Sequence, residues 1–180
     1  MGPVQIQRWL DDNAHRLDLA TQYLGDEPNA VGKAWDSAPL RWLLAASWPY
    51  EQAVGNSSIP AVYRCVNDTD ALADRFYLPA TPRDLNLLTQ AGIGPFGIET
   101  KHPAADFDIV ATSISYPVLS MSFVKLLTAA GLPARRRDRE HDPGGYPMVL
   151  VGGLSFGAPE VLAPVADCWW LGEVEDEPAN

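Results

Sequence analysis

The sequence contains few of the residues on which metal and redox chemistry depends. Its 180 residues include two cysteines, Cys65 and Cys168, and three histidines. The cysteines lie far apart and form no CxxC or CxxxCxxC motif, so we expect no iron–sulfur cluster in this chain. The isolated His15, His102 and His141 form no HExxH pair and are expected on the surface or in loops.

Several short catalytic and phosphate-binding motifs are also missing. The glycines form neither a GxxxxGK[ST] phosphate loop nor a GxGxxG dinucleotide fingerprint. The serines do not occur in GxSxG, the pattern of a nucleophile elbow. The sequence therefore gives no motif-based support for a nucleotide-dependent enzyme or a serine hydrolase.

Basic residues are scarce, at 13 Lys and Arg against 23 Asp and Glu, which gives a net charge of −10. A phosphate backbone would repel such a chain, so we expect no nucleic-acid partner. The basic cluster at 134–140 includes two acidic residues and is interpreted as a solvated loop. We also expect no membrane span and no export signal, and therefore a cytoplasmic protein. The reason is that no apolar run reaches ~18 residues and the N-terminus lacks a signal-peptide pattern.

Apolar residues are plentiful, at 47% of the chain, which is enough for a folded core. We expect an N-terminal helix and wrapping loop over 1–38 and one α/β domain over 39–180. Residues 4–25 are predicted as one amphipathic helix. The side chains expected on its apolar side are Ile6, Trp9, Leu10 and Leu17.

From residue 39 onward, apolar strands alternate with helices. The strands are expected at 39–49, 74–82, 107–115, 147–153 and 167–173, with a short extra strand at 96–100. The helices are expected at 57–68, 82–92, 117–133 and 158–167. Strands that are apolar on both faces and alternate with helices indicate a doubly wound α/β fold with a five-stranded, mostly parallel sheet.

Glycines follow the last two predicted strands. Gly152 and Gly153 end the fourth, and Gly172 precedes Glu173 after the fifth. In doubly wound sheets, ligands bind at the carboxyl ends of the strands. Glycine there either lets the backbone approach a large flat ligand or only permits a tight turn. Spacing alone leaves both interpretations open.

Several segments, in order and spacing, resemble a single family. They are 22–36, 48–56, 62–68, 73–80, 96–116, 126–139 and 149–176. They resemble the N-terminal half of a group of radical S-adenosylmethionine (SAM) proteins, a cobalamin-binding-like domain of flavodoxin-like type. The resemblance covers about residue 16 to the C-terminus.

The resemblance implies a corrinoid lying over the strand ends. The matching positions are Tyr50, Glu51, Gly55, Ser113, Ser115, Gly152, Gly153, Gly172 and Glu173. It implies that a serine hydroxyl after the third strand hydrogen-bonds the dimethylbenzimidazole tail, for which the glycine pair leaves room. Glu173 either accepts hydrogen bonds from the ligand or is simply solvated.

The sequence also departs from the family pattern. The loop after the first strand keeps Glu51 and Gly55 but lacks the histidine that ligates cobalt, so cobalamin would bind without a protein lower ligand. Pro117 replaces a glutamate after Tyr116, and Ala158 replaces a helix-capping asparagine, a loss of ~1 kcal/mol.

The three-cysteine motif of the catalytic half is absent from this sequence. We therefore expect no radical catalysis by this chain alone, and a separate radical SAM barrel subunit as its partner. One alternative is a degenerate scaffold protein that binds no corrinoid. Another is a small independent enzyme that uses Tyr50 and Glu51.

Trp169 and Trp170 bear on the scaffold hypothesis, because neighbouring strand residues point to opposite faces and an exposed tryptophan favours a partner surface.

Overall fold

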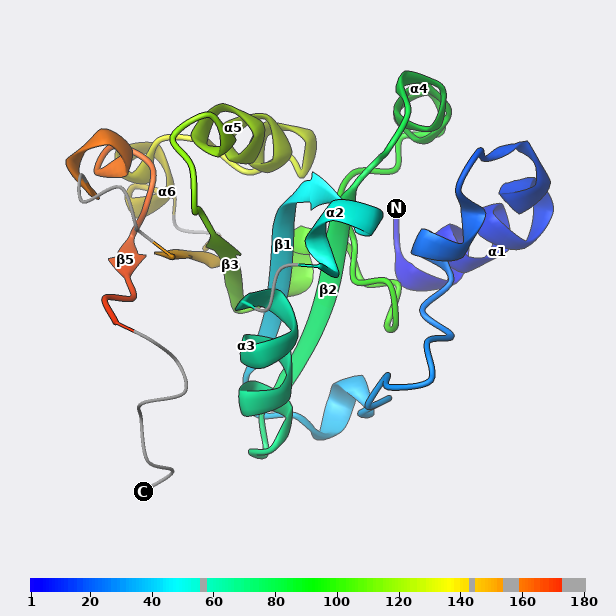
Figure 1. Cartoon of the computed structure of the whole chain (residues 1–180), viewed down its shortest axis with the longest axis horizontal. Coiled ribbons are helices and arrows are strands. Elements are labelled where there is room, and N and C mark those ends of the chain that lie inside the picture. Colours follow the sequence, from blue (N-terminus) through cyan, green and yellow to red (C-terminus); the bar gives the residue numbers. More distant parts are fainter. Residues whose placement is uncertain (56–57, 143–144, 154–158, 173–180) are drawn as a thin grey trace.

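The computed structural model describes residues 1–55, 58–142, 145–153 and 159–172. They form one five-stranded sheet in the order β2-β1-β3-β4-β5, with every neighbouring pair parallel (Figure 1). The strands are β1 (Arg41–Pro49), β2 (Leu72–Leu78), β3 (Ile109–Ser113), β4 (Met148–Gly152) and β5 (Cys168–Trp169). This is the strand order of flavodoxin-like doubly wound sheets. The predicted fold class is confirmed.

Helices connect the strands. The α-helices are α1 (Pro3–Asn13), α2 (Tyr50–Ala53), α3 (Ser58–Asn67), α4 (Pro82–Gln90), α5 (Leu119–Ala129) and α6 (Arg136–Glu140). Shorter 3-10 turns are η1 (Ala14–Arg16), η2 (Ala20–Tyr23), η3 (Trp35–Ser37), η4 (Ala104–Asp106) and η5 (Pro159–Leu162). The predicted helical stop after α5 is present, since Gly131 has a φ of +74°.

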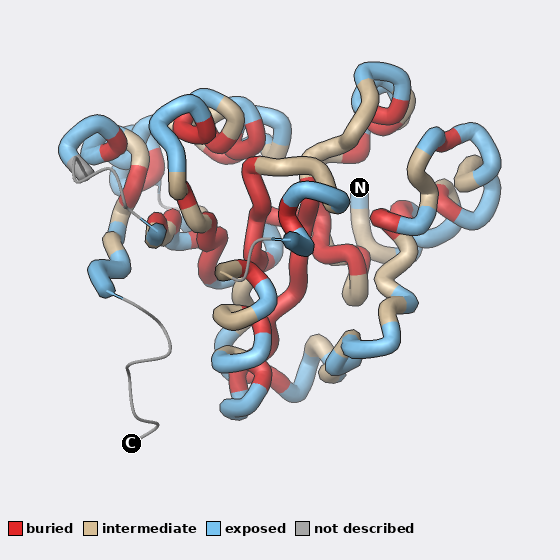
Figure 2. Tube along the Cα trace, in the orientation of Figure 1, coloured by how far each residue is buried: buried red, intermediate tan, exposed pale blue. Residues whose placement is uncertain are grey.

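Crossover handedness assigns each helix to a face of the sheet. The β1-to-β2 crossover runs in the opposite direction to the other three, so right-handed connections place α3 on one face and α4, α5 and α6 on the other. Figure 1 shows α3 separated by the sheet from α5 and α6. We call these the α3 face and the α5 face. Figure 2 shows the sheet as the buried centre, with the outer sides of the helices exposed.

The N-terminal helix is shorter than predicted. The sequence suggested one helix over 4–25, but α1 ends at Asn13, and η1 and η2 follow as separate turns. Downstream, the backbone N–H groups of Asp18 and Leu19 donate to the Asp84 carboxylate at 2.8 and 3.3 Å instead of to helical carbonyls. These two hydrogen bonds to a distant side chain take the place of the backbone hydrogen bonds of a continuing helix. Ile6 and Leu10 are buried as expected.

The short strand predicted at 96–100 is wrong. This segment makes an isolated antiparallel bridge between Phe96 and Pro103 and a single backbone hydrogen bond to β2, from the Ile98 N–H to the Arg75 carbonyl at 2.9 Å. The N–H groups of Glu99 and Thr100 bond instead to the carboxylate of Asp74 on β2, at 3.1 and 2.8 Å. Because those donors are used by a side chain, no ladder can form along this segment.

The helix predicted at 158–167 is also wrong over its described part. Only the 3-10 turn η5 forms, and Ala158 lies outside the described residues. Pro164 lies within the predicted helix, where it has no N–H to donate and would clash with the preceding turn. Leu162 and Ala166 are nevertheless buried, so the chain packs its apolar residues here without a full helix.

A buried carboxylate organises the outer end of the sheet. Asp74 is fully buried and also accepts from the Arg75 N–H at 2.6 Å and from the Thr100 hydroxyl at 2.7 Å. Burial raises the pKa of Asp74, and the nearby Glu99 carboxylate adds to the rise, while the donated hydrogen bonds oppose it. Its hydrogen bonds hold the 97–101 loop against β2.

Arg75 joins the N-terminal segment to this loop. Its guanidinium pairs with Glu27 and, at 2.8 Å, with Glu99, and it stacks over the ring of Tyr63 on α3. Lys33 also donates to the Ala71 carbonyl at 2.7 Å before β2. The N-terminal segment therefore wraps the β2 side of the sheet. The domain boundary expected at residue 39 stays a prediction.

Across the described parts of the chain, no helix has the length and apolar character needed to cross a membrane.

Asp74→Asn tests the buried carboxylate. Whichever way the amide is oriented, its NH2 group faces a backbone N–H, so we expect a loss of about 2–4 kcal/mol in the free energy of unfolding, measured by urea denaturation. The control is Asp68→Asn at an exposed acid, which should change stability by less than about 0.5 kcal/mol. Equal effects of the two substitutions would contradict the role given to Asp74.

Candidate functional site

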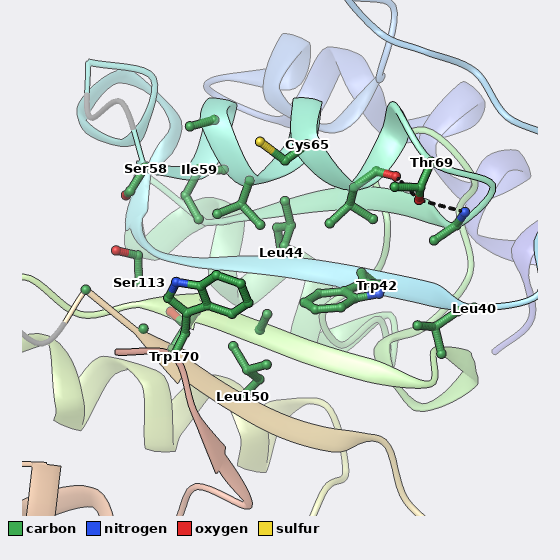
Figure 3. A pocket seen from close by; sticks show the side chains of 18 of the residues that line it. Leu40, Trp42, Leu44, Ser58, Ile59, Cys65, Thr69, Ser113, Leu150 and Trp170 are labelled. Carbon is green, nitrogen blue, oxygen red and sulfur yellow. Dashed lines mark hydrogen bonds between the residues drawn. The ribbon is translucent and has the colours of Figure 1, made fainter. Parts of the chain in front are cut away.

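A trough of about 560 Å³ runs along the α3 face, between α3 and the sheet (Figure 3). One wall is the inner side of α3, including Ile59, Val62 and Val66. The floor is made by alternate residues of three neighbouring strands. They are Trp42 and Leu44 of β1, Ala111 and Ser113 of β3, and Leu150 and Gly152 of β4.

The local sequence explains this floor. Side chains alternate across a strand, so the residues between the floor positions point to the α5 face. The residues on that face of these strands include Leu43, Val110 and Val151, all fully buried. Because both sets are largely apolar, each strand has an apolar side on both faces. The α5 face is covered by helices, whereas the α3 face keeps an open trough.

Turns from three strands meet at one end of the trough. Ser113 ends β3, Gly152 ends β4, Gly153 follows it and Gly172 follows β5, and all four line the trough. Figure 3 shows Ser113 and Ser58, the first residue of α3, at the same end. Parallel strands end at a common edge, which is why residues so distant in sequence gather here. The switch point of the strand order lies between β1 and β3, and Ser113 at this end of the trough is the last residue of β3.

Gly153 is required for the close approach of β3 and β4. Its φ is +70°, a conformation that side chains disfavour. A Cβ at this position would overlap Ser113 Oγ and lie 3.2 Å from the Ile114 nitrogen. At Gly152, by contrast, a Cβ would meet Trp170 Cβ at an ordinary 3.5 Å. Gly152 therefore leaves space within the trough that the fold itself does not need.

The opposite end of the trough is lined by Leu40, Trp42, Thr69 and Asp70 (Figure 3). The indole Nε1 of Trp42 is buried and has no hydrogen-bond partner among the described residues. Cys65, a free thiol on α3, lies between the two ends. The trough is thus mainly apolar, with few polar groups that a ligand could engage.

Other residues proposed from the sequence lie outside the trough lining. Tyr50 packs edge-to-face on Tyr77 at 5.1 Å. Burial raises the pKa of Tyr50, and its hydrogen bond to Glu27 raises it further. Glu51 and Gly55 are exposed. Tyr50 and Glu51 therefore do not line the trough.

Two further positions complete this comparison. Ser115, two residues beyond the end of β3, does not line the trough. Glu173 lies outside the described residues. The proposed positions that the fold brings together are therefore Ser113, Gly152, Gly153 and Gly172.

Sequence reasoning missed the apolar floor, including Trp42 and Leu150. The signal was present, because strands apolar on both faces require cover on both faces. The direction of each strand-to-strand connection would have shown that α3 is the one connecting helix on its face. For Trp170 the sequence left open a place in the core or on a partner surface. Its side chain is 38% exposed and lines the trough.

The described residues hold no group of three or more His, Cys, Asp or Glu side chains that could bind a metal ion. What the trough offers chemically is an apolar slot with glycine turns and a serine hydroxyl at one end. That arrangement suits binding of a flat, mostly apolar group.

The two glycines give a matched test of the strand-end geometry. Gly153→Ala should lower the free energy of unfolding by about 1–3 kcal/mol, because it combines a disfavoured φ with overlap at Ser113. Gly152→Ala should change it by less than about 1 kcal/mol, since the methyl group makes an ordinary contact. Urea denaturation measures both. If Gly153→Ala left the free energy of unfolding unchanged, the close approach of β3 and β4 would not require glycine at this position.

Comparison with known proteins gives the family. None of the curated proteins compared with the chain matches it. Residues 58–179 match the family model described as radical SAM proteins, N-terminal, and the match spans more than half of the chain and all the trough-forming strands except β1. This chain belongs to that family, the N-terminal region of radical SAM proteins.

Proposed function

We propose that this chain is a corrinoid-binding module of a radical SAM system, with the nucleotide tail of the corrinoid held in the trough. The observation that carries the proposal is the position of the trough. It opens where the turns after β3, β4 and β5 meet, beside the β1/β3 switch point. Ligands of doubly wound sheets bind at this edge.

The residues that line the trough fit a benzimidazole nucleotide. An apolar slot walled by Val62 and Leu44 suits a flat aromatic base, and its volume of about 560 Å³ is within the range of small-molecule sites. Ser113 offers a hydroxyl at the entrance, and Gly152 leaves room beside Trp170. The base would be surrounded mainly by apolar side chains and would hydrogen-bond at its polar edge.

The loop between β1 and α3 limits how the cobalt would be held. Its described part contains Tyr50, Glu51 and Gly55 but no histidine. A corrinoid whose tail occupies the trough would therefore have its own base removed from the cobalt, with no imidazole replacing it. Bound in this way, the corrinoid would supply a cobalt centre able to carry an alkyl group.

Radical chemistry would come from another polypeptide segment. The sequence has two cysteines, whereas cluster binding for this chemistry needs a three-cysteine motif. The module would therefore act beside a radical SAM barrel, as a binding or accessory unit. The alternative, a scaffold without corrinoid, is favoured by one observation, the exposure of Trp170.

The test is a titration of the full chain with hydroxocobalamin, followed in the visible spectrum. We expect saturable binding and a shift toward the spectrum of a corrinoid whose base has left the cobalt. Diaquocobinamide, which lacks the nucleotide tail, should bind at least about tenfold more weakly, a difference of about 1.4 kcal/mol. Equal affinity for the two corrinoids, or no spectral change at high protein concentration, would rule out this mode of binding.

Substitutions in the trough test whether the nucleotide tail of the corrinoid binds there. Gly152→Leu extends a side chain into the trough and should weaken hydroxocobalamin binding at least about tenfold, while Gly152→Ala is its control. Ser113→Ala should weaken binding severalfold through loss of one hydrogen bond. Ser115→Ala should leave it unchanged, because Ser115 does not line the trough. The reverse order at the two serines would place the ligand elsewhere on the edge.

A further inference from the structure

The helix α3 has two sides with different surroundings. The side that lines the trough includes Val62, Cys65 and Val66, and each of these three keeps some exposure to solvent. The other side contacts β2, where the buried Asn67 side chain exchanges hydrogen bonds with the Ala73 backbone at 2.9 and 3.1 Å. Because an open trough gives α3 no support, the position of this helix depends on its contacts on the other side.

Tyr63 is buried in the middle of that other side. Its hydroxyl accepts a hydrogen bond from the Val31 N–H at 2.7 Å and donates one to a Glu99 carboxylate oxygen at 3.0 Å. The Arg75 guanidinium lies 4.3 Å from the centroid of its ring. Burial raises the pKa of Tyr63, the bond from Val31 opposes the rise and Glu99 adds to it. The hydroxyl therefore stays protonated and can donate.

The Glu99 carboxylate joins three parts of the chain at this hydroxyl. One oxygen accepts from Tyr63 on α3 and from the Gly32 N–H at 3.4 Å. The other oxygen accepts from Arg75 on β2 at 2.8 Å. Glu99 is itself held in place, because its N–H donates to the buried Asp74 carboxylate at 3.1 Å. The hydroxyl of Tyr63 thus ties α3 to the β2 edge of the sheet.

The same N-terminal residues also reach the far end of the trough. We call residues 27–33 the strap, because their contacts run from Arg75 on β2 to Tyr63 on α3. At the end of the strap, the Lys33 ammonium donates to the Ala71 carbonyl at 2.7 Å and also to the Thr69 carbonyl. Thr69 and Ala71 both line the trough. The strap therefore contacts the helix wall and the far end together.

We infer that Tyr63 is a positioning residue for the trough, and that its hydroxyl, held by the strap and by Glu99, fixes the distance between α3 and the strands opposite. The inference rests on the proposed function in taking the trough as the ligand site. Without the hydroxyl, the ring can still pack under Arg75 but α3 loses its tie to Val31 and Glu99. A wall that is free to shift is less well preorganised, so a ligand should bind more weakly.

Fluorescence across the trough measures the position of the wall without a ligand. In a Cys168→Ser variant, Cys65 is the single cysteine, and a bimane label on it lies in the trough that Trp42 also lines (Figure 3). Tryptophan quenches bimane at short range by electron transfer, so the emission reports their separation. Tyr63→Phe should raise the emission toward that of Trp42→Phe, in which this quenching is lost.

Ile93→Val is the matched control for lost stability. Ile93 is buried and is not among the residues that line the trough. Removing one buried methyl group destabilises a protein about as much as removing one hydrogen bond. Ile93→Val should therefore leave bimane emission unchanged, and far-ultraviolet circular dichroism checks that every variant folds. Unchanged emission in Tyr63→Phe, or an equal rise in Ile93→Val, would overturn the inference.

Glu99→Gln tests whether Tyr63 acts through the carboxylate. The amide keeps the size of the side chain but turns an NH2 group toward one of the donors that Glu99 accepts from. This variant should also raise bimane emission. Adding Tyr63→Phe to it should raise the emission little further, because both substitutions break the same tie. Fully additive rises would mean that the two residues act on α3 separately and would overturn the tie through Glu99.

Hydroxocobalamin titration connects the wall to the proposed ligand. Tyr63→Phe should weaken binding severalfold, whereas Ile93→Val should not change it. If the unsubstituted chain binds no hydroxocobalamin, the proposed function fails, and bimane emission still decides the role of Tyr63. If that chain binds and Tyr63→Phe changes neither emission nor affinity, the positioning role fails and the proposed function stands. A change in emission without a change in affinity would overturn the link between wall position and binding.

Discussion

The handedness of the crossovers is the constraint on which the rest of this structure depends. In the order β2-β1-β3-β4-β5, the β1-to-β2 connection turns back against the direction of the others. Right-handed connections then leave α3 alone among the crossover helices on its face. Within the described residues, β3 and β4 are buried on one side and line the trough on the other.

The trough has two chemically different parts. At the strand ends, Ser113 and the glycines form a narrow entrance with a hydroxyl and little side-chain bulk. Farther along, Trp42, Leu44 and Leu150 make an apolar floor. One sheet face therefore carries a narrow polar end and a broader apolar floor side by side.

A buried charge network fixes the opposite side of the molecule. Asp74 holds the 97–101 loop by its backbone N–H groups, and Arg75 joins that loop to Glu27 in the N-terminal segment. Burying the charge of Asp74 or Arg75 without a partner would be costly. The 97–101 loop and the N-terminal segment, which supply the partners, are therefore held in place. This network ties the 97–101 loop and the N-terminal segment to the β2 edge of the sheet.

The sequence by itself determined the parallel α/β fold, because apolar runs, helical spacing and glycine stops are local properties of the chain. It also located Ser113, Gly152, Gly153 and Gly172, since residues that follow parallel strands must share an edge. Only the tertiary structure decided the ends of α1 and the absence of a strand at 96–100, where buried carboxylates on distant residues take the backbone donors. It alone also separated Tyr50 from the trough and left Trp170 exposed, because which face of a strand is covered depends on the path of every connection.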